Sequence, residues 1–117
     1  VARGTESMPV VFAIHQLSDK TPRDVRLGVT CDYYDKGWIG RVVDAQSDGL
    51  FVEVAGIVAD DLDEVFEIGN FMHDSKTPHL NPDSTQRMHS LSIGDIIHNM
   101  ETDECHVVAQ TGFTRLF

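Results

Sequence analysis

The chain has 117 residues, of which 41% are hydrophobic, so its length and composition fit one domain with its own core. Nineteen acidic residues against nine basic ones give a net charge of −10 at pH 7, which argues against direct binding of nucleic-acid phosphates. No apolar run approaches the roughly 18 residues that span a bilayer, and no signal peptide is recognisable. We therefore expect a cytoplasmic protein with no membrane partner.

The first seven residues stand apart from the rest of the chain. They precede Met8 and Pro9, which resemble a natural start. We interpret residues 1–7 as a vector remnant or disordered tail, with a native extension as the alternative. A single domain is then expected over residues 8–117.

The N-terminal part of that domain is predicted to begin with a central strand. Residues 9–15 form a continuous apolar run of strand length. Thr21 and Pro22 then resemble a helix start, with Thr as the N-cap and Pro at the first helical position, so a short helix is expected. Residues 29–35 are ambiguous, because two tyrosines favour a strand and the aspartates favour a turn.

A β-hairpin is predicted in the middle of the chain. Residues 38–43 are interpreted as its first strand and residues 50–57 as its second. The intervening Ser47-Asp48-Gly49 favours a tight turn, because Asp-Gly suits the positive backbone angles of a hairpin loop.

An amphipathic helix is predicted over residues 61–72. Asp60 or Asp61 caps it, and Glu64 lies three residues after Asp61, which is the spacing of a capping box. Acids in the first turn also complement the positive end of the helix dipole. The stripe expected to face the sheet comprises Leu62, Val65, Phe66, Gly69 and Met72. Gly69 indicates either close packing or the end of the helix.

Residues 73–87 lack a periodic pattern and are rich in residues that favour turns, so they are predicted to form a loop. A loop of about fifteen residues is long for a compact domain, and such loops are often functional or mobile. One hypothesis for function therefore places this loop over a pocket.

The stretch over residues 88–97, with the sequence Met-His-Ser-Leu-Ser-Ile-Gly-Asp-Ile-Ile, is the most informative part of the chain. Gly94 and Asp95 predict a tight bend, because Gly tolerates unusual backbone angles and Asp hydrogen-bonds its local backbone. A strand is expected to follow from Ile96 to about Met100.

A second hairpin is predicted after this bend. Residues 101–103 form a polar turn, and residues 104–110 form a returning strand. A turn centred on Thr102 places His98 opposite His106 on one face. The other, buried face would then hold Ile97, Cys105, Val107 and Ala109. Phe113, Leu116 and Phe117 are expected to close the core.

These residues resemble the C-terminal half of the YodL-like domain, which small phage-encoded proteins share. The resemblance rests on His-Ser-Leu-Ser-Ile-Gly-Asp-Ile-Ile at 89–97 and Thr-Gly-Phe-Thr-Arg-Leu at 111–116. An acidic helix like that of residues 61–70 precedes this stretch in the relatives, so the resemblance covers roughly residues 60–116. It implies a phage or mobile-element context and a role in host interaction or counter-defence. It supplies no catalytic residues.

The acidic helix is the candidate binding surface. The interval between Arg41 and Lys76 contains many acids and no Lys or Arg, and like charges on one helix face cost helix stability. One explanation is capping with ordinary solvation. The alternative is a face that docks onto a basic host protein and comprises Asp60, Asp61, Asp63, Glu64 and Glu67.

Metal and catalytic chemistry have little support in the sequence. Among the six histidines, His98 and His106 near Cys105 are weak zinc candidates, but structural zinc normally needs four ligands. The two cysteines, Cys31 and Cys105, lie in no Cys-x-x-Cys motif and are expected to be reduced. Nucleophile-elbow and phosphate-loop motifs are missing. We therefore predict no metal, no cofactor and no enzymatic activity.

These observations predict an α+β domain with a mostly antiparallel sheet of about five strands, two hairpins and one main amphipathic helix, at about residues 61–72, packed on the sheet. The favoured function is a small acidic accessory protein that binds a host protein in the host cytoplasm. Two alternatives stay open. One is a ligand-binding or enzymatic domain using the 73–87 loop; the other is a self-associating module or homodimer that pairs an exposed strand edge.

Overall fold

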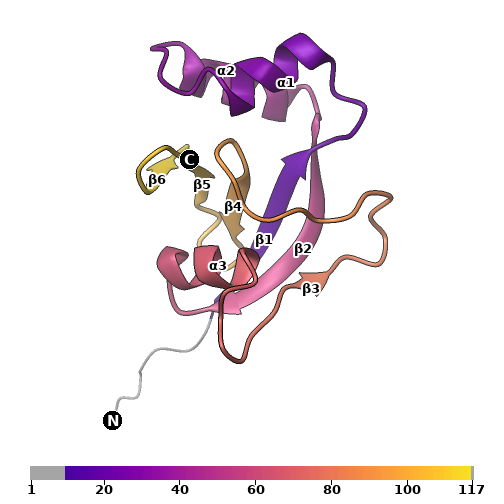
Figure 1. Ribbon diagram of the computed structural model, residues 1–117, viewed down its shortest axis with the longest axis vertical. Helices are drawn as coiled ribbons and strands as arrows, with labels where there is room; N and C mark the ends of the chain where they lie inside the picture. The colour runs from indigo at the N-terminus through magenta and orange to yellow at the C-terminus, as the bar shows by residue number, and fades with distance from the viewer. Residues whose placement is uncertain (1–9, 117) are drawn as a thin grey trace.

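The computed structural model describes residues 10–116 and has an α+β fold, as the sequence predicted (Figure 1). The predicted remnant over residues 1–7, the expected start at Met8 and Phe117 lie outside these residues. The elements in chain order are β1 (Val10–Leu17), α1 (Arg23–Thr30), α2 (Trp38–Ser47), β2 (Phe51–Ala59), α3 (Leu62–Gly69), β3 (His79–Leu80), β4 (Ile96–Asn99), β5 (Cys105–Val108) and β6 (Phe113–Arg115).

The strands form one antiparallel sheet of six strands in the order β3-β2-β1-β4-β5-β6. β1 lies inside the sheet between β2 and β4, so the prediction of a central strand in the apolar N-terminal run is confirmed. β1 and β2 pair from Val10 opposite Ala59 to Leu17 opposite Phe51. Within residues 10–116, no helix combines the length and apolar character needed to cross a membrane.

Helices cover both faces of the sheet. Consecutive strand residues point to opposite faces, so Ile96 and Ile97 belong to different core clusters. Val65 and Ile68 of α3 pack in the cluster that holds Ile97. α1 and α2 contribute to the other cluster and lie together near the end of β1 (Figure 1).

The hairpin predicted for the middle of the chain is wrong, because residues 38–43 belong to helix α2. Trp38, Val42 and Ala45 recur at helical spacing, and all three are buried. The Asp-Gly pair ends this helix instead of turning a hairpin. Gly49 has a φ of +73°, its N–H bonds the Gln46 carbonyl at 3.1 Å, and Leu50 N bonds the Ala45 carbonyl at 3.0 Å. This is a Schellman C-cap, which needs the same positive φ as a tight hairpin turn.

The helix before α2 also starts differently from the prediction. α1 begins at Arg23 with Pro22 as its N-cap residue, and no side chain caps it. The side-chain oxygen of Thr21 is buried and has no hydrogen-bond partner among the described residues. The ambiguous residues 29–35 include the last two residues of α1 and the turns that lead to α2.

α3 begins as the sequence predicted and ends earlier. Asp61 is the N-cap, and its Oδ1 accepts a hydrogen bond from Glu64 N at 2.8 Å. Glu64 Oε1 in turn accepts from Asp60 N at 2.8 Å. The helix ends at Gly69, so the expected extension to residue 72 is wrong, and Met72 is 69% exposed. A Cβ on Gly69 would overlap the side chain of Leu91, so this glycine permits close packing. The chain turns away from the helix at Phe71, which has a φ of +59°.

The register of the β4–β5 hairpin differs by one residue from the prediction. His98 lies opposite Cys105, and His106 lies opposite Ile97. Asn99 Oδ1 accepts from Glu101 N at 2.9 Å and from Thr102 N at 3.1 Å, so the turn begins at Asn99 instead of being centred on Thr102. A shift of one residue moves side chains to the other face, so the two histidines point in opposite directions.

Candidate functional site

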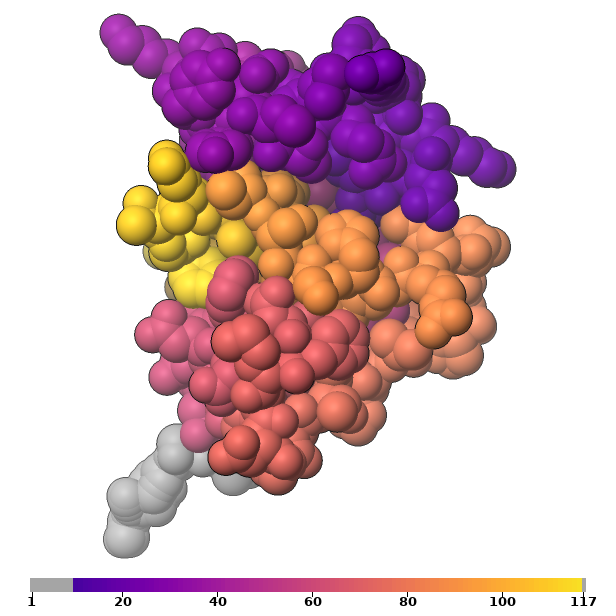
Figure 2. Space-filling model, in the orientation of Figure 1, coloured from indigo at the N-terminus to yellow at the C-terminus, as the bar shows by residue number. Residues whose placement is uncertain are grey.

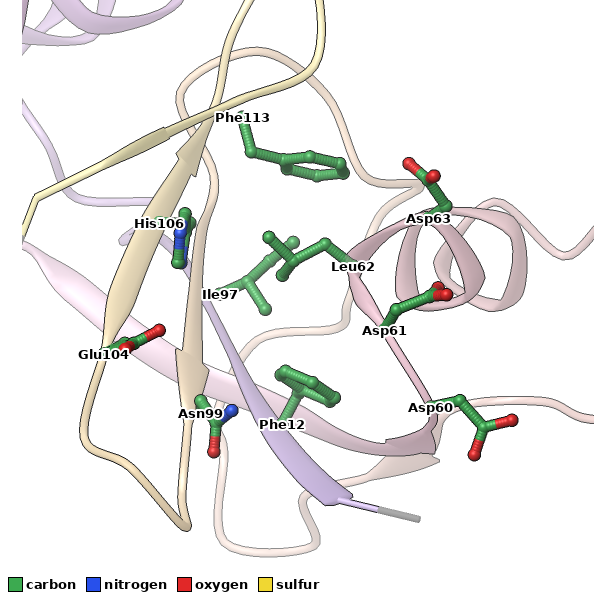
Figure 3. A pocket seen from close by; sticks show the side chains of 10 residues that line it. All are labelled: Phe12, Asp60, Asp61, Leu62, Asp63, Ile97, Asn99, Glu104, His106 and Phe113. Atoms are coloured by element: carbon green, nitrogen blue, oxygen red, sulfur yellow. The ribbon is translucent and has the colours of Figure 1, made fainter. Parts of the chain in front are cut away.

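A cavity of about 500 Å³ lies between the start of α3 and the β4–β5 hairpin (Figure 3). Four apolar side chains form its floor: Phe12, Leu62, Ile97 and Phe113. Polar side chains surround them: Asp60, Asp61 and Asp63 on the helix side, and Asn99, Glu104 and His106 on the strand side (Figure 3). The cavity therefore combines an apolar floor with a mostly acidic rim.

Strand pairing explains why these distant residues meet. Phe12 of β1 lies opposite Asn99 of β4, and Ile97 of β4 lies opposite His106 of β5. Paired residues, and residues two apart on a strand, share one face of a sheet. This face is also the one that α3 covers, so the short connection from Ala59 to Leu62 brings the aspartates to its edge.

The acidic side chains on the rim differ in the hydrogen bonds and ion pairs that they make. Asp61 is engaged as the helix cap, and Glu104 pairs with Arg115 at 3.6 Å. Within residues 10–116, the carboxylates of Asp60 and Asp63 have neither a hydrogen bond nor an ion pair, and both residues are exposed. These two therefore present unpaired negative charge beside the cavity.

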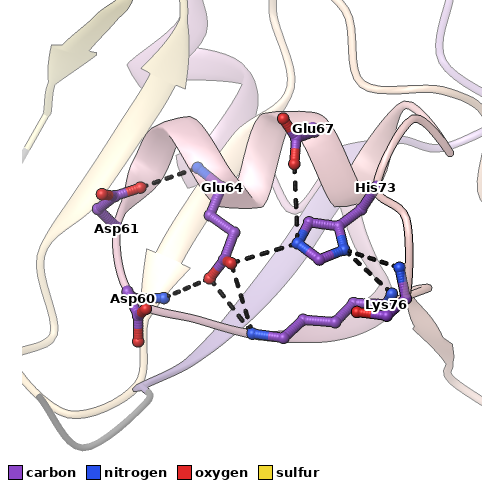
Figure 4. Close-up of polar contacts among 7 residues, drawn as sticks. Asp60, Asp61, Glu64, Glu67, His73 and Lys76 are labelled. Atoms are coloured by element: carbon purple, nitrogen blue, oxygen red, sulfur yellow. Dashed lines mark hydrogen bonds and ion pairs between the residues drawn. The ribbon is translucent and has the colours of Figure 1, made fainter.

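Glu64 and Glu67 belong to a different cluster (Figure 4). Glu64 lies 3.4 Å from both Lys76 Nζ and His73 Nε2, and Glu67 lies 3.7 Å from the same His73 nitrogen. The hydrogen bond from Asp60 N, supported by Lys76 and His73, holds the pKa of Glu64 below its usual value. These contacts fasten residues 73–76 to α3. The five residues predicted as one binding face therefore separate into a rim group of three and an internally paired group of two.

The stretch that carries the family resemblance forms a buried polar network. Gln16 is 0% exposed, and its Nε2 donates to His89 O at 2.9 Å and to Asp95 Oδ2 at 3.0 Å. Gln16 Oε1 accepts from His89 N at 3.1 Å, and Ser92 N donates to Asp95 Oδ2 at 2.9 Å. Gly94 makes the predicted bend with a φ of +97°. The network ties residues 89–95 to β1, which is a structural role.

Burial of Asp95, which is 4% exposed, raises the pKa of its carboxyl from 3.8 to about 6. The hydrogen bond from Ser92 N, the nearby His89 and Gln16 oppose this rise. Between about pH 4 and pH 6 the folded protein then holds a proton that the unfolded chain releases. The contribution of Asp95 to the free energy of unfolding should therefore fall as pH rises through this window, by up to about 3 kcal/mol.

Urea unfolding of the wild type and of Asp95→Asn at pH 4.5 and pH 6.5 would measure this contribution. The amide oxygen of Asn can accept the bonds from Ser92 and Gln16 without titrating. We expect the wild type to lose more stability than the variant between the two pH values. The same loss in both proteins would contradict the raised pKa of Asp95.

The fold does not bring the weak zinc candidates His98, Cys105 and His106 together at one site. His98 Nε2 lies 3.0 Å from Asp103 Oδ1, and the His98 ring centroid lies 6.1 Å from that of His15. Cys105 shares the face of His98, whereas His106 points to the opposite face. Among residues 10–116, no group of three or more metal-binding side chains is found. Cys31 and Cys105 are both free thiols.

The 73–87 loop does not cover the 500 Å³ cavity, because none of its described residues lines that cavity. The loop instead follows β2. It contains β3, whose Leu80 pairs with Ala55, and Asn81 Nδ2 donates to Glu53 O at 3.0 Å. A smaller hollow of about 260 Å³ is lined by Val58, Ser75, Lys76, Thr77 and His79. The hypothesis that the 73–87 loop lies over a pocket therefore does not apply to the 500 Å³ cavity.

Sequence reasoning found the aspartates and missed the cavity floor. Phe12 and Ile97 come from separate strands, and each is indistinguishable in sequence from an ordinary core residue. Comparison with family models, with curated proteins and with solved structures finds no match to this chain. The resemblance to the YodL-like domain therefore stays a prediction.

Proposed function

We propose that this chain is a small non-enzymatic protein that binds a basic surface of another protein through the acidic rim beside α3. The observation that carries the proposal is the pair of carboxylates of Asp60 and Asp63, which have no partner within residues 10–116 and lie next to a cavity with an apolar floor. Unpaired surface charge steers a partner of opposite charge and selects against partners of like charge.

The chemistry of the cavity suits a protein partner. Its acidic rim can attract basic side chains, and its apolar floor can bury hydrophobic ones. The net charge of −10 also favours a basic protein over nucleic acid as the partner. In the phage context that the resemblance implies, the partner is a host protein and the complex forms in the host cytoplasm.

Reversal of two charges on the rim would test the proposal. We expect Asp60→Lys with Asp63→Lys to weaken partner capture roughly tenfold or more, because attraction becomes repulsion. The measurement is a pull-down from bacterial lysate at low salt and at about 0.5 M salt, where the Debye length is well below 10 Å. The wild type should retain a basic protein at low salt and lose it at high salt.

A matched control is available on the same part of the chain. Glu67→Lys with Asp74→Lys makes the same change in net charge at two exposed residues that do not line the cavity. This control should capture the partner nearly as well as the wild type. If the rim variant is folded by circular dichroism and captures the partner as well as the control does, the acidic rim is not the binding surface.

A further inference from the structure

The acidic cavity continues as a groove along α3. A second hollow of about 340 Å³ shares Asp63 and Phe113 with the cavity. A third hollow of about 400 Å³ shares Phe66, Val108, Ala109 and Gln110 with the second. Figure 2 shows the C-terminal segment lying directly beside α3 on this side of the molecule. We call the three connected hollows the α3 groove.

The chemistry of the α3 groove changes along its length. One end carries the charges of Asp60 and Asp63, which have no partner among the described residues. The middle is apolar, and there Phe66 packs edge-on against Phe113 with ring centroids 6.2 Å apart. The far end is uncharged, with Thr30, Ser92 and Gln110 among its lining residues. The groove therefore has one charged end, an apolar middle and one neutral end.

The aromatic pair in the middle is only partly buried. Phe66 lies on the sheet-facing stripe predicted from sequence, yet it is 36% exposed, and Phe113 is half-buried. Both side chains line the second hollow. Aromatic side chains that are open to solvent in a concave surface supply much of the binding energy when a partner covers them.

We propose that the α3 groove binds a linear segment of a partner protein, with a Lys or Arg near Asp60 and Asp63 and bulky apolar side chains over Phe66 and Phe113. Charge complementarity assigns the basic residue to the acidic end, and the apolar middle takes the residues next to it. Three connected open hollows fit several consecutive side chains better than one enclosed small molecule. This inference rests on the proposed function and names the kind of segment that the basic partner offers.

A random dodecapeptide display library, selected on the full chain, would test this inference. We expect enriched peptides to contain Lys or Arg within a few residues of an aromatic or large aliphatic residue. Their affinity should fall about tenfold or more on Phe66→Ser, because an exposed aromatic anchor is lost. Met72→Ser is the matched control: Met72 lies outside the groove, is 69% exposed, and its replacement should leave the affinity unchanged.

A second measurement keeps the result independent of how well the variants fold. Peptide titration followed by backbone amide NMR of the wild type should shift the signals of Phe66, Val108 and Gln110 more than those of residues 73–87. Shifts confined to another surface would overturn the inference, and so would a selection that enriches no peptide above the level on an unrelated protein.

The outcomes also separate this inference from the proposed function. Enriched peptides that are basic without apolar residues, and that lose affinity on Asp60→Lys with Asp63→Lys but not on Phe66→Ser, would overturn the groove while leaving the acidic rim as the binding surface. Peptides that bind the charge-reversed rim as well as the wild type would overturn both.

Discussion

Replacing Gln16 by Ala should lower the free energy of unfolding by roughly 2–4 kcal/mol. Gln16 is fully buried, and its amide serves both the backbone of His89 and the carboxylate of Asp95. Removing that side chain deprives the backbone of His89 of its bonds to the Gln16 amide, leaves Asp95 with Ser92 N as its remaining donor in the network, and opens a cavity beside β1. Urea denaturation at pH 7, monitored by circular dichroism, would measure the loss.

Two further variants separate the causes of this loss. Gln16→Met keeps most of the side-chain volume and removes the hydrogen bonds. The fall in its free energy of unfolding therefore measures what the hydrogen bonds contribute. Gln86→Ala is the control, because Gln86 also binds the backbone, with Nε2 3.0 Å from Leu17 O, but is less buried. We expect the control to lose less than about 1 kcal/mol. Equal losses for Gln16→Ala and Gln86→Ala would show that the buried network contributes little.

Replacing Trp38 by Ala should cost roughly 3–5 kcal/mol, the usual range for a buried aromatic residue. Trp38 is 5% exposed and packs in the core cluster between α1, α2 and the sheet. Its Nε1 also donates to Val29 O at 2.6 Å, which joins α2 to the end of α1. Thermal and urea unfolding would both report the change.

Two control variants show how much of the loss comes from the hydrogen bond and how much from burial of the ring. Trp38→Phe keeps an aromatic ring and loses the hydrogen bond to Val29, so we expect a loss of roughly 1–2 kcal/mol. Tyr34→Ala removes a nearby aromatic residue that is 78% exposed, and it should change stability by less than about 0.5 kcal/mol. A Trp38→Ala variant as stable as Tyr34→Ala would mean that α1 and α2 do not depend on this contact.

The sequence by itself determined those parts of the fold whose signals are local. The apolar run after Pro9 became the central strand β1, since a strand buried on both faces needs few polar side chains. The Asp61–Glu64 spacing located the start of α3, because a helix cap is satisfied within four residues of the chain. Gly94 marked the bend before β4, because a φ of +97° favours glycine.

Where a local signal is compatible with two structures, the tertiary structure decides between them. Residues 38–43 form a mostly apolar segment that is too short to distinguish a strand from a helix, and packing of Trp38 and Val42 on the sheet makes it helical. The Asp48-Gly49 turn fits either structure, because a C-cap and a tight hairpin both need a positive φ.

The candidate site was likewise only partly readable from the sequence. Five acids near α3 were identifiable, but two of them contact His73 or Lys76 instead of lining the cavity, and only the folded chain brings those groups together. The floor of the α3 groove joins Phe12 to Phe113 across the sheet. Contacts between residues so far apart depend on strand order and register, which a single sequence does not encode locally.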